Sequence, residues 1–243
     1  MQNSKGAGMI VLKKGREISL MKEACKISAN ALKLAGEMVE PGVTTWEIDK
    51  EVKNFIEKAG AVPSFLNYRG FPASTCISDN EVDIRGIPAK KQLLKQGDIV
   101  DIDIGAFYKG FPGDNAWTYP CGEITEETRK LLDATEESLF KGIEQARPGN
   151  RIGDIGHAVQ EYAEARGYAV VREFVCHGVG AQLHQDPNVP NYGSPGWGVR
   201  LLPGPTISLD PWLNQCTPYA KLLSPGPTTT TNQGLLSPHF SHI

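Results

Sequence analysis

Apolar and acidic residues alternate along residues 98–107, and this period-2 pattern is typical of a half-buried β-strand. A turn signal follows, so we expect a β-hairpin with its two-residue loop at Tyr108-Lys109. That loop would place Asp103 directly opposite Asp114, with Asp101 on the same face. Like charges at this spacing repel, so the face is solvated, partly protonated or bound to a cation. An exposed acidic face and a metal site both stay open from these residues alone.

Apolar residues at helical spacing predict two pairs of helices, each pair broken by Pro-Gly and each ending at a glycine. A short strand is also expected near the N-terminus, and two apolar segments precede the hairpin. The predicted helices are 16–39, 44–60, 125–147 and 154–166, the short strand is 9–12, and the apolar segments lie near 64–66 and 74–78.

The two halves of the chain also match at an offset of 107 positions. Pro41 meets Pro148, Gly42 meets Gly149 and Gly60 meets Gly167, within the same order of helix, break, helix and glycine. We interpret this recurrence as an internal duplication, with halves at about 9–124 and 125–243 and a pseudo-two-fold axis between them. Two generic amphipathic helix pairs are the alternative. In a duplicated fold a site usually lies between the halves.

Composition narrows the class of protein. The chain has 243 residues, enough for one large domain or two small ones, and we expect a single domain over 9–243. A content of 40% hydrophobic and 22% charged residues is ordinary for a globular protein, and the net charge of −3 suggests neither a nucleic-acid nor a membrane surface. The polar residues 1–8 are interpreted as a disordered leader without a signal-peptide core. The five cysteines are dispersed and odd in number, which indicates reduced thiols in a cytoplasm.

The second half supplies two histidines and an acid that could join the carboxylates. His177 lies between β-branched residues and glycines, His184 follows shortly after, and Asp210 ends a strand-like run. Each histidine taken alone is more often structural than a ligand.

These residues together resemble the type I methionine aminopeptidases, over nearly the whole chain. The markers are Asn67-Tyr68-Arg69-Gly70-Phe71-Pro72-Ala73-Ser74-Thr75-Cys76-Ile77-Ser78, the spacing of Asp103 and Asp114, His177-Gly178-Val179-Gly180, and His184-x-x-Pro187. The resemblance implies an α+β pita-bread (creatinase/aminopeptidase) fold, with two pseudo-symmetric halves of antiparallel sheet covered by helices. It also implies a hydrolase that removes the initiator methionine from nascent chains.

The resemblance implies roles for particular residues. Two divalent metals would be bound by carboxylates and one histidine, one residue would contact the scissile carbonyl, and three would line the methionine pocket. The implied metal ligands are Asp103, Asp114, His177 and Asp210, with Ser241 at the last ligand position; His184 contacts the carbonyl; Tyr68, Phe71 and Cys76 line the pocket. His184, Asp210 and Arg85 stand at the positions of catalytic residues.

Three positions depart from the family's pattern. Asp210 stands where the family has glutamate, Ser241 where it has its last glutamate ligand, and Arg85 where it has a histidine that handles protons. These departures predict one well-held metal and a weak second site. They leave two main hypotheses: an active methionyl aminopeptidase, perturbed at its metal site, and an inactive protein of the same fold that binds N-terminal peptides or another partner. A C-terminal third that has drifted from the family is a further alternative.

The resemblance also implies the surroundings of the protein. The cofactor is a divalent metal of the Co, Mn, Fe, Zn or Mg class. The partners are the N-termini of nascent polypeptides, with ribosome association as a further expectation, and neither a nucleic acid nor a membrane is expected. The protein is expected to be a cytoplasmic monomer.

Overall fold

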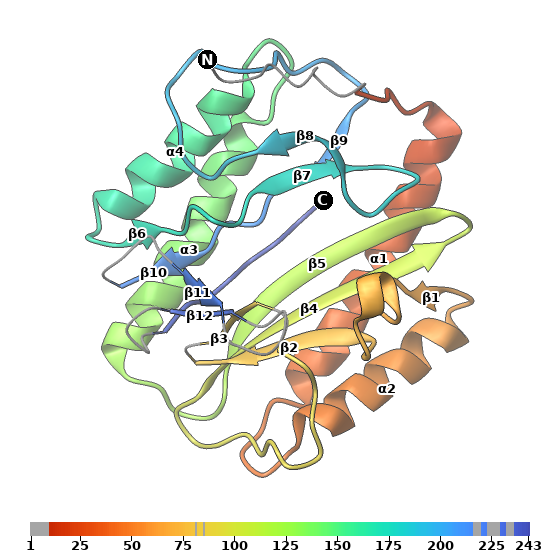
Figure 1. The fold of residues 1–243 in the computed structure, drawn as a ribbon, viewed down its shortest axis with the longest axis vertical. Helices are drawn as coiled ribbons and strands as arrows, with labels where there is room; N and C mark the ends of the chain where they lie inside the picture. Colours follow the sequence, from red (N-terminus) through yellow and green to blue (C-terminus); the bar gives the residue numbers. More distant parts are fainter. Residues whose placement is uncertain (1–9, 81, 85, 216–219, 223–228, 232–235) are drawn as a thin grey trace.

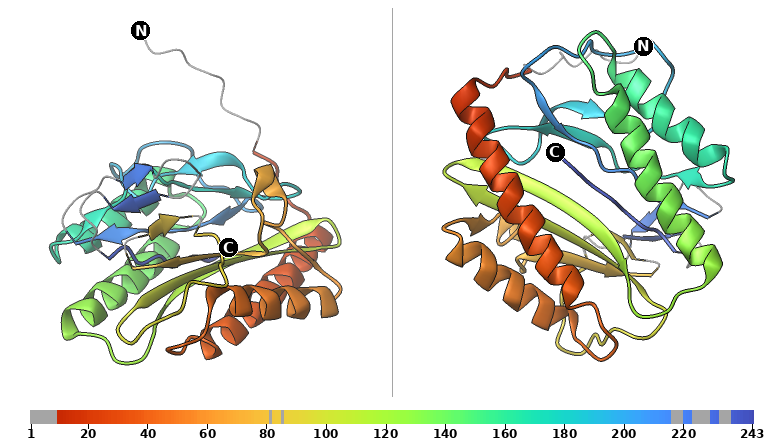
Figure 2. Two further views of the ribbon diagram at one scale, coloured as in Figure 1. Left: turned by 60° about the horizontal axis from the view of Figure 1, so that its bottom comes forward. Right: turned by 180° about the vertical axis from the view of Figure 1, so that it is seen from behind.

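A computed structural model describes residues 10–80, 82–84, 86–215, 220–222, 229–231 and 236–243. Two helix pairs cover the same outer side of a set of antiparallel strands, and the strands of the two halves meet on the inner side (Figures 1 and 2). The helices are α1 (Gly15–Glu37), α2 (Thr45–Lys58), α3 (Glu126–Gln145) and α4 (Ile152–Glu164), with a 3-10 turn η1 at Tyr68–Gly70. Along these residues no helix combines the length and apolar character needed to cross a membrane.

The first half is built on the long strand β4, which pairs with β5 along one edge and with β1 and β2 along the other. Buried residues of β4, including Ile102 and Ile104, pack in one core with Ile48 and Val52 of α2 and with Leu32 of α1. The strands are β1 (Val62–Pro63), β2 (Thr75–Asp79), β3 (Val82–Ile84), β4 (Ile99–Tyr108) and β5 (Phe111–Pro120).

The second half has a three-stranded sheet in the order β8-β7-β9 and a two-stranded sheet of β10 and β6. A further three-stranded sheet, in the order β11-β12-β3, joins two strands of this half to β3 of the first half. Its core joins Leu139 of α3 and Ile155 of α4 to Cys176 of β7. The strands are β6 (Ala169–Val170), β7 (Cys176–Val179), β8 (Gln185–Val189), β9 (Thr206–Ser208), β10 (Leu213–Asn214), β11 (Ala220–Leu222) and β12 (Thr229–Thr231).

The C-terminal segment 239–242 connects the two halves. Ser241 exchanges backbone hydrogen bonds with Ala116 of β5, while His242 exchanges them with Leu209, just after β9. Phe240 is buried against Trp117 with ring centroids 4.6 Å apart. This segment therefore completes the continuous layer of strands on which the site is built.

The predicted helices are confirmed, with small shifts at their ends. Thr44 and Thr125 act as N-caps, and each accepts a hydrogen bond from the backbone amide three residues on. The fourth helix begins at Ile152 rather than Asp154, because Asp154 occupies the third helical position and accepts from the Arg151 amide at 2.6 Å.

Two predictions about strands are wrong. Residues 10–12 form no strand, and Met9 and the leader 1–8 lie outside the described residues. The hairpin loop is Lys109-Gly110 rather than Tyr108-Lys109, so Asp114 lies opposite Gly105. Lys109 and Gly110 both have positive φ, 49° and 87°, as a tight turn of this class requires, and glycine adopts that conformation more readily than tyrosine.

The recurrence at 107 positions is visible in the elements. Ile152 begins α4 107 positions after Thr45 begins α2, and Gly60 and Gly167 have positive φ values of 74° and 83° after the two helices. This agreement supports the internal duplication, which itself stays a prediction.

Candidate active site and metal centre

A pocket of about 870 Å³ opens where the two halves meet. Every described residue that the sequence analysis assigned to a site lines this pocket: Tyr68, Phe71, Cys76, Asp103, Asp114, His177, His184, Asp210 and Ser241. Arg85 lies outside the described residues. The structure thus brings together residues that are up to about 170 positions apart in the chain, and their roles stay predictions.

Asp103 and Asp114 converge although the predicted register was wrong. Asp103 lies opposite Ala116, so Asp114 is its diagonal neighbour on the same face of the β4–β5 hairpin. Moving the loop by one residue changes the pairing by two, and side chains keep their face when the register shifts by two. Both carboxyl groups therefore point to the same face of the hairpin and line the pocket.

These two carboxyl groups are destabilised as anions. Burial raises the pKa of Asp103 well above its usual range, and the charges of Asp101 and Asp210 add to this effect. Burial likewise raises the pKa of Asp114, reinforced by Asp103 and opposed by His177. Asp114 Oδ1 is buried and has no hydrogen-bond partner. A proton or a cation is therefore needed here, and oxygen-rich donor sets suit divalent ions.

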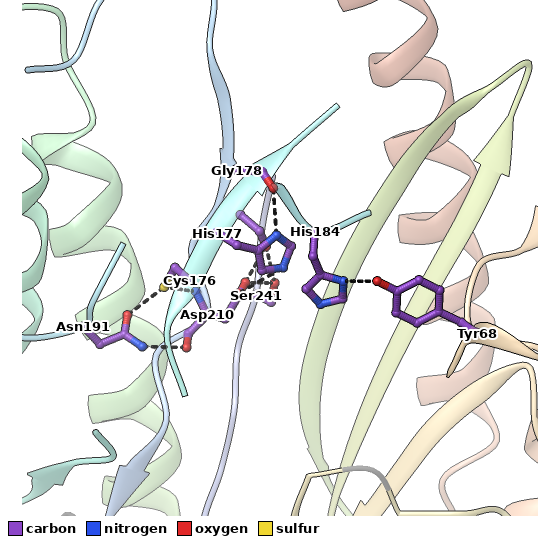
Figure 3. A network of polar contacts seen from close by, with 9 residues as sticks. Tyr68, Cys176, His177, Gly178, His184, Asn191, Asp210 and Ser241 are labelled. Atoms are coloured by element: carbon purple, nitrogen blue, oxygen red, sulfur yellow. Dashed lines mark hydrogen bonds and ion pairs between the residues drawn. The ribbon is translucent and has the colours of Figure 1, made fainter. Parts of the chain in front are cut away.

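His177 presents one ring nitrogen to the same place. Its Nδ1 lies 2.9 Å from the carbonyl oxygen of Gly178, which can only accept, so Nδ1 is the donor of this hydrogen bond and Nε2 is the ring nitrogen nearer Asp210. Nε2 lies 3.9 Å from Asp210 Oδ2 (Figure 3). A histidine held in this way is suited to binding a metal through Nε2.

Asp210 is held by two hydroxyl groups. Ser241 Oγ donates to Asp210 Oδ1 at 2.5 Å, and Ser208 Oγ donates to the same oxygen. Ser241 therefore acts here as a hydrogen-bond donor to Asp210, and the second oxygen, Oδ2, is left facing His177. Among the described residues no three His, Cys, Asp or Glu side chains stand as close as a complete metal site requires. The donor types, carboxylate oxygens and one imidazole nitrogen, nevertheless fit a divalent ion.

His184 links the two halves across the pocket. Its Nδ1 lies 3.1 Å from the hydroxyl oxygen of Tyr68, and the two rings stack (Figure 3). Its ring also lies against that of His177, with centroids 4.3 Å apart. His184 is thus held beside the candidate metal ligands. Cys76 pairs with Asp103 across β2 and β4, which places the apolar pocket wall next to the carboxylates.

A second buried pair lines the pocket and was given no role from the sequence. His239 Nδ1 lies 3.5 Å from Asp101 Oδ1, and the His239 ring stacks on Trp212 at 3.9 Å. Burial raises the pKa of Asp101, and the charge of His239 opposes this rise. Period-2 spacing from Asp103 and from Ser241 could have indicated both residues. The contacts of Cys176 and Asn191 behind Asp210 had no such signal, because they depend on tertiary packing.

The comparisons with known proteins agree with this geometry. The model of metallopeptidase family M24 matches residues 19–228. The chain is 46% identical over 234 residues to methionine aminopeptidase 1 of Bacillus subtilis, covering 96% of this chain and 94% of that protein. It is 47% identical over 234 residues to the methionine aminopeptidase of Clostridium perfringens, with the same coverage of 96% and 94%.

Solved structures give the same result. The crystal structure of methionine aminopeptidase from Thermotoga maritima has a TM-score of 0.94 and 40% identity, covering 96% of this chain and 94% of that one. Prolidase from Pyrococcus furiosus shares the fold, with a TM-score of 0.74 and 23% identity. The match covers 95% of this chain and 61% of the prolidase chain. The chain belongs to the metallopeptidases of family M24 and, within them, to the methionine aminopeptidases. Its fold is the pita-bread fold of α+β class that the resemblance implied.

Proposed function

We propose that this protein is a metal-dependent methionyl aminopeptidase, which removes the N-terminal methionine from nascent polypeptides. The observation that carries the proposal is the convergence of Asp103, Asp114, Asp210 and His177 in one pocket between the halves. Family membership supports the same reaction. The comparisons lend no support to the alternative of an inactive binding protein.

The ligands proposed for the metal are Asp103, Asp114, His177 and Asp210. A divalent ion held by these residues would supply Lewis acidity, the property needed to polarise the scissile carbonyl and to activate water. We propose one firmly held ion and a weaker second one, because Ser241 brings a neutral hydroxyl group to the last ligand position. The metal is proposed to be of the Co, Mn, Fe, Zn or Mg class.

The remaining residues position the substrate and move a proton. Asp210 Oδ2 is the carboxylate oxygen left unbound by the two serines, so it is the atom proposed to accept the proton of the water and deliver it to the leaving amine. His184 is proposed to contact the scissile carbonyl, held by Tyr68. Tyr68, Phe71 and Cys76 are proposed to receive the methionine side chain. A role for Arg85 in contacting the substrate rests on the resemblance alone.

The substrate, the partners and the cellular location are proposed from the same reaction. Nascent chains are the proposed substrates, ribosome association is a further proposal, and the protein is proposed to be a cytoplasmic monomer. The substrate's free α-amine would bind beside the carboxylates, which accounts for cleavage at the chain end.

The test is methionine release from a Met-Ala-Ser peptide by the metal-loaded full chain, compared with the chelated protein. Asp114→Asn should abolish release because it removes an anionic ligand, while Asp133→Asn, an exposed acid on α3, should leave it unchanged. A folded, Mn²⁺-loaded wild-type chain that releases no methionine would refute the proposed activity.

A further inference from the structure

The backbone of Asp210 is held from behind by a closed ring of three hydrogen bonds. Cys176 Sγ donates to Asn191 Oδ1 at 2.8 Å, Asn191 Nδ2 donates to the Asp210 carbonyl oxygen at 2.9 Å, and the Asp210 amide donates to Cys176 Sγ at 2.9 Å (Figure 3). Both backbone polar groups of Asp210, its amide and its carbonyl group, are therefore held by the side chains of Cys176 and Asn191.

The ring lies on the far side of β7 from the pocket. Successive strand residues point to opposite faces, so His177 faces the pocket while Cys176 faces the core. Cys176 and Asn191 are 0% and 1% exposed. Asn191 follows β8, so the ring ties that strand to β7 and to the segment after β9.

Burying the polar groups of this ring costs desolvation free energy, which apolar side chains in the same place would not cost. A buried amide or thiol without a partner is unfavourable, and a buried polar network is favourable only when each member is satisfied. Here each of the three groups both donates and accepts within the ring. The packing of Cys176 among apolar residues of the second core does not by itself require an amide at position 191.

The consequence for the site follows from the length of the Asp210 side chain. Aspartate has only two side-chain torsions, so the position of its backbone largely determines where its carboxylate lies. Ser208 and Ser241 hold Oδ1, and Oδ2 is left 3.9 Å from His177 Nε2. With the backbone also fixed, few orientations of this carboxylate remain.

We propose that Cys176 and Asn191 are positioning residues that hold the Asp210 carboxylate towards the metal, an inference that rests on the proposed metal-dependent function. Partners that orient a metal ligand without touching the metal typically contribute about 10–100-fold to metal affinity. Cys176 acts through the Asp210 amide, and Asn191 acts through the Asp210 carbonyl group. Their effect should therefore appear in metal binding itself, before any turnover.

The experiment measures the Mn²⁺ dissociation constant of the full chain by calorimetry, together with urea unfolding of each metal-free variant. Cys176→Ala and Asn191→Ala remove different members of the ring, and Cys176→Ser keeps a group that both donates and accepts. Cys121→Ala is the matched control, because Cys121 is also fully buried but lies in the core of the first half. The same Cys176→Ala change is also made in an Asp210→Ala background.

We expect Cys176→Ala and Asn191→Ala to weaken Mn²⁺ binding by about 10–100-fold, with Cys176→Ser close to wild type. Cys121→Ala should lower stability without changing the dissociation constant. Cys176→Ala should have no further effect on binding once Asp210 is alanine, because the two act through one carboxylate. If either ring variant that folds loses stability yet binds Mn²⁺ as wild type does, the positioning role is wrong. If the wild-type chain binds no Mn²⁺, the proposed function and this inference both fail.

Discussion

Ser241 is the residue on which the proposed metal stoichiometry depends. It is 3% exposed, lies beside Asp210 and offers a neutral oxygen where a further anionic ligand would strengthen a second site. Its hydroxyl group instead stabilises the Asp210 carboxylate as a hydrogen-bond donor.

We predict that Ser241→Glu strengthens binding of a second Mn²⁺ ion by roughly tenfold or more, because it adds a charged oxygen ligand beside Asp210. Calorimetric titration checks this prediction. Ser241→Gln is the control, since it has the same size and no charge. Equal second-site affinities for the Glu and Gln variants would contradict the prediction.

Protonation of Asp103 and Asp114 should make binding of the proposed metal depend on pH. Burial raises both pKa values, so the folded, metal-free chain retains protons that the unfolded chain releases. Without metal, the free energy of unfolding should therefore fall as the pH rises. The fall begins near pH 4, which is about the carboxyl pKa in the unfolded chain, and continues up to the higher pKa values of the folded chain. A bound cation needs these groups ionised, so its affinity should rise with pH over the same range.

Proton release should consequently accompany Mn²⁺ binding at a pH above about 4, where the carboxyl groups are ionised in the unfolded chain but still protonated in the folded one. Calorimetry in two buffers with different ionisation enthalpies measures it directly, because released protons add the buffer's heat to the signal. Asp114→Asn should release fewer protons than wild type. Identical binding heats in both buffers would show that the carboxyl groups are already ionised.

The β4–β5 hairpin is the element that presents two of the acids, and its glycines serve different purposes. Gly110 has a positive φ and open space around its α-carbon, whereas a Cβ at Gly113 would lie 2.3 Å from backbone atoms of Ala24 and Cys25 in α1. Gly113 thus lets β5 approach the helix closely, immediately before Asp114.

We predict that Gly110→Ala costs about 1 kcal/mol through backbone strain alone and leaves methionine release unchanged. Gly113→Ala should cost roughly 1–3 kcal/mol, because helix and strand must separate, and should also reduce release by displacing Asp114. Urea unfolding and the peptide assay measure the two effects. A Gly113→Ala variant with wild-type activity would show that the hairpin shifts without moving the acid.

At the scale of the whole molecule, the C-terminal segment joins β5 to the strand region of the second half and carries Ser241. Phe240 anchors this segment in the core, 2% exposed and in edge-on contact with Trp117. Stability and site geometry should therefore be coupled through this one side chain.

Phe240→Ala is expected to cost about 3–5 kcal/mol, because it leaves a cavity between the halves. It should also weaken Mn²⁺ binding, since Ser241 and the Asp210 carboxylate lose their shared position. Leu93→Ala, at a residue that is 52% exposed before β4, serves as the control and should change the free energy of unfolding by about 0.5 kcal/mol or less. If the Phe240→Ala chain is less stable but binds Mn²⁺ as wild type does, the C-terminal segment does not control the geometry of the site.

Local sequence determined the helices, their caps and the acidic face of the hairpin. Periodicity and capping act between residues a few positions apart, so Thr44, Thr125 and the period-2 acids could be recognised directly. Asp103 and Asp114 were correctly predicted to share a face although the predicted loop position was wrong. The error shifted the register by two residues, and a shift of two leaves each side chain on the same face. The resemblance supplied the pocket residues, which no spacing would have joined.

Only the tertiary structure decided how those residues act on one another. The hydrogen bonds that Asp210 receives from two serines, and the ring formed with Cys176 and Asn191, join segments up to 34 positions apart. The loop at Lys109-Gly110 depended on which residues tolerate positive φ in the folded hairpin. Burial, which raises the pKa of Asp103 and Asp114, exists only after both halves and the C-terminal segment close around them, because desolvation is a property of the assembled core.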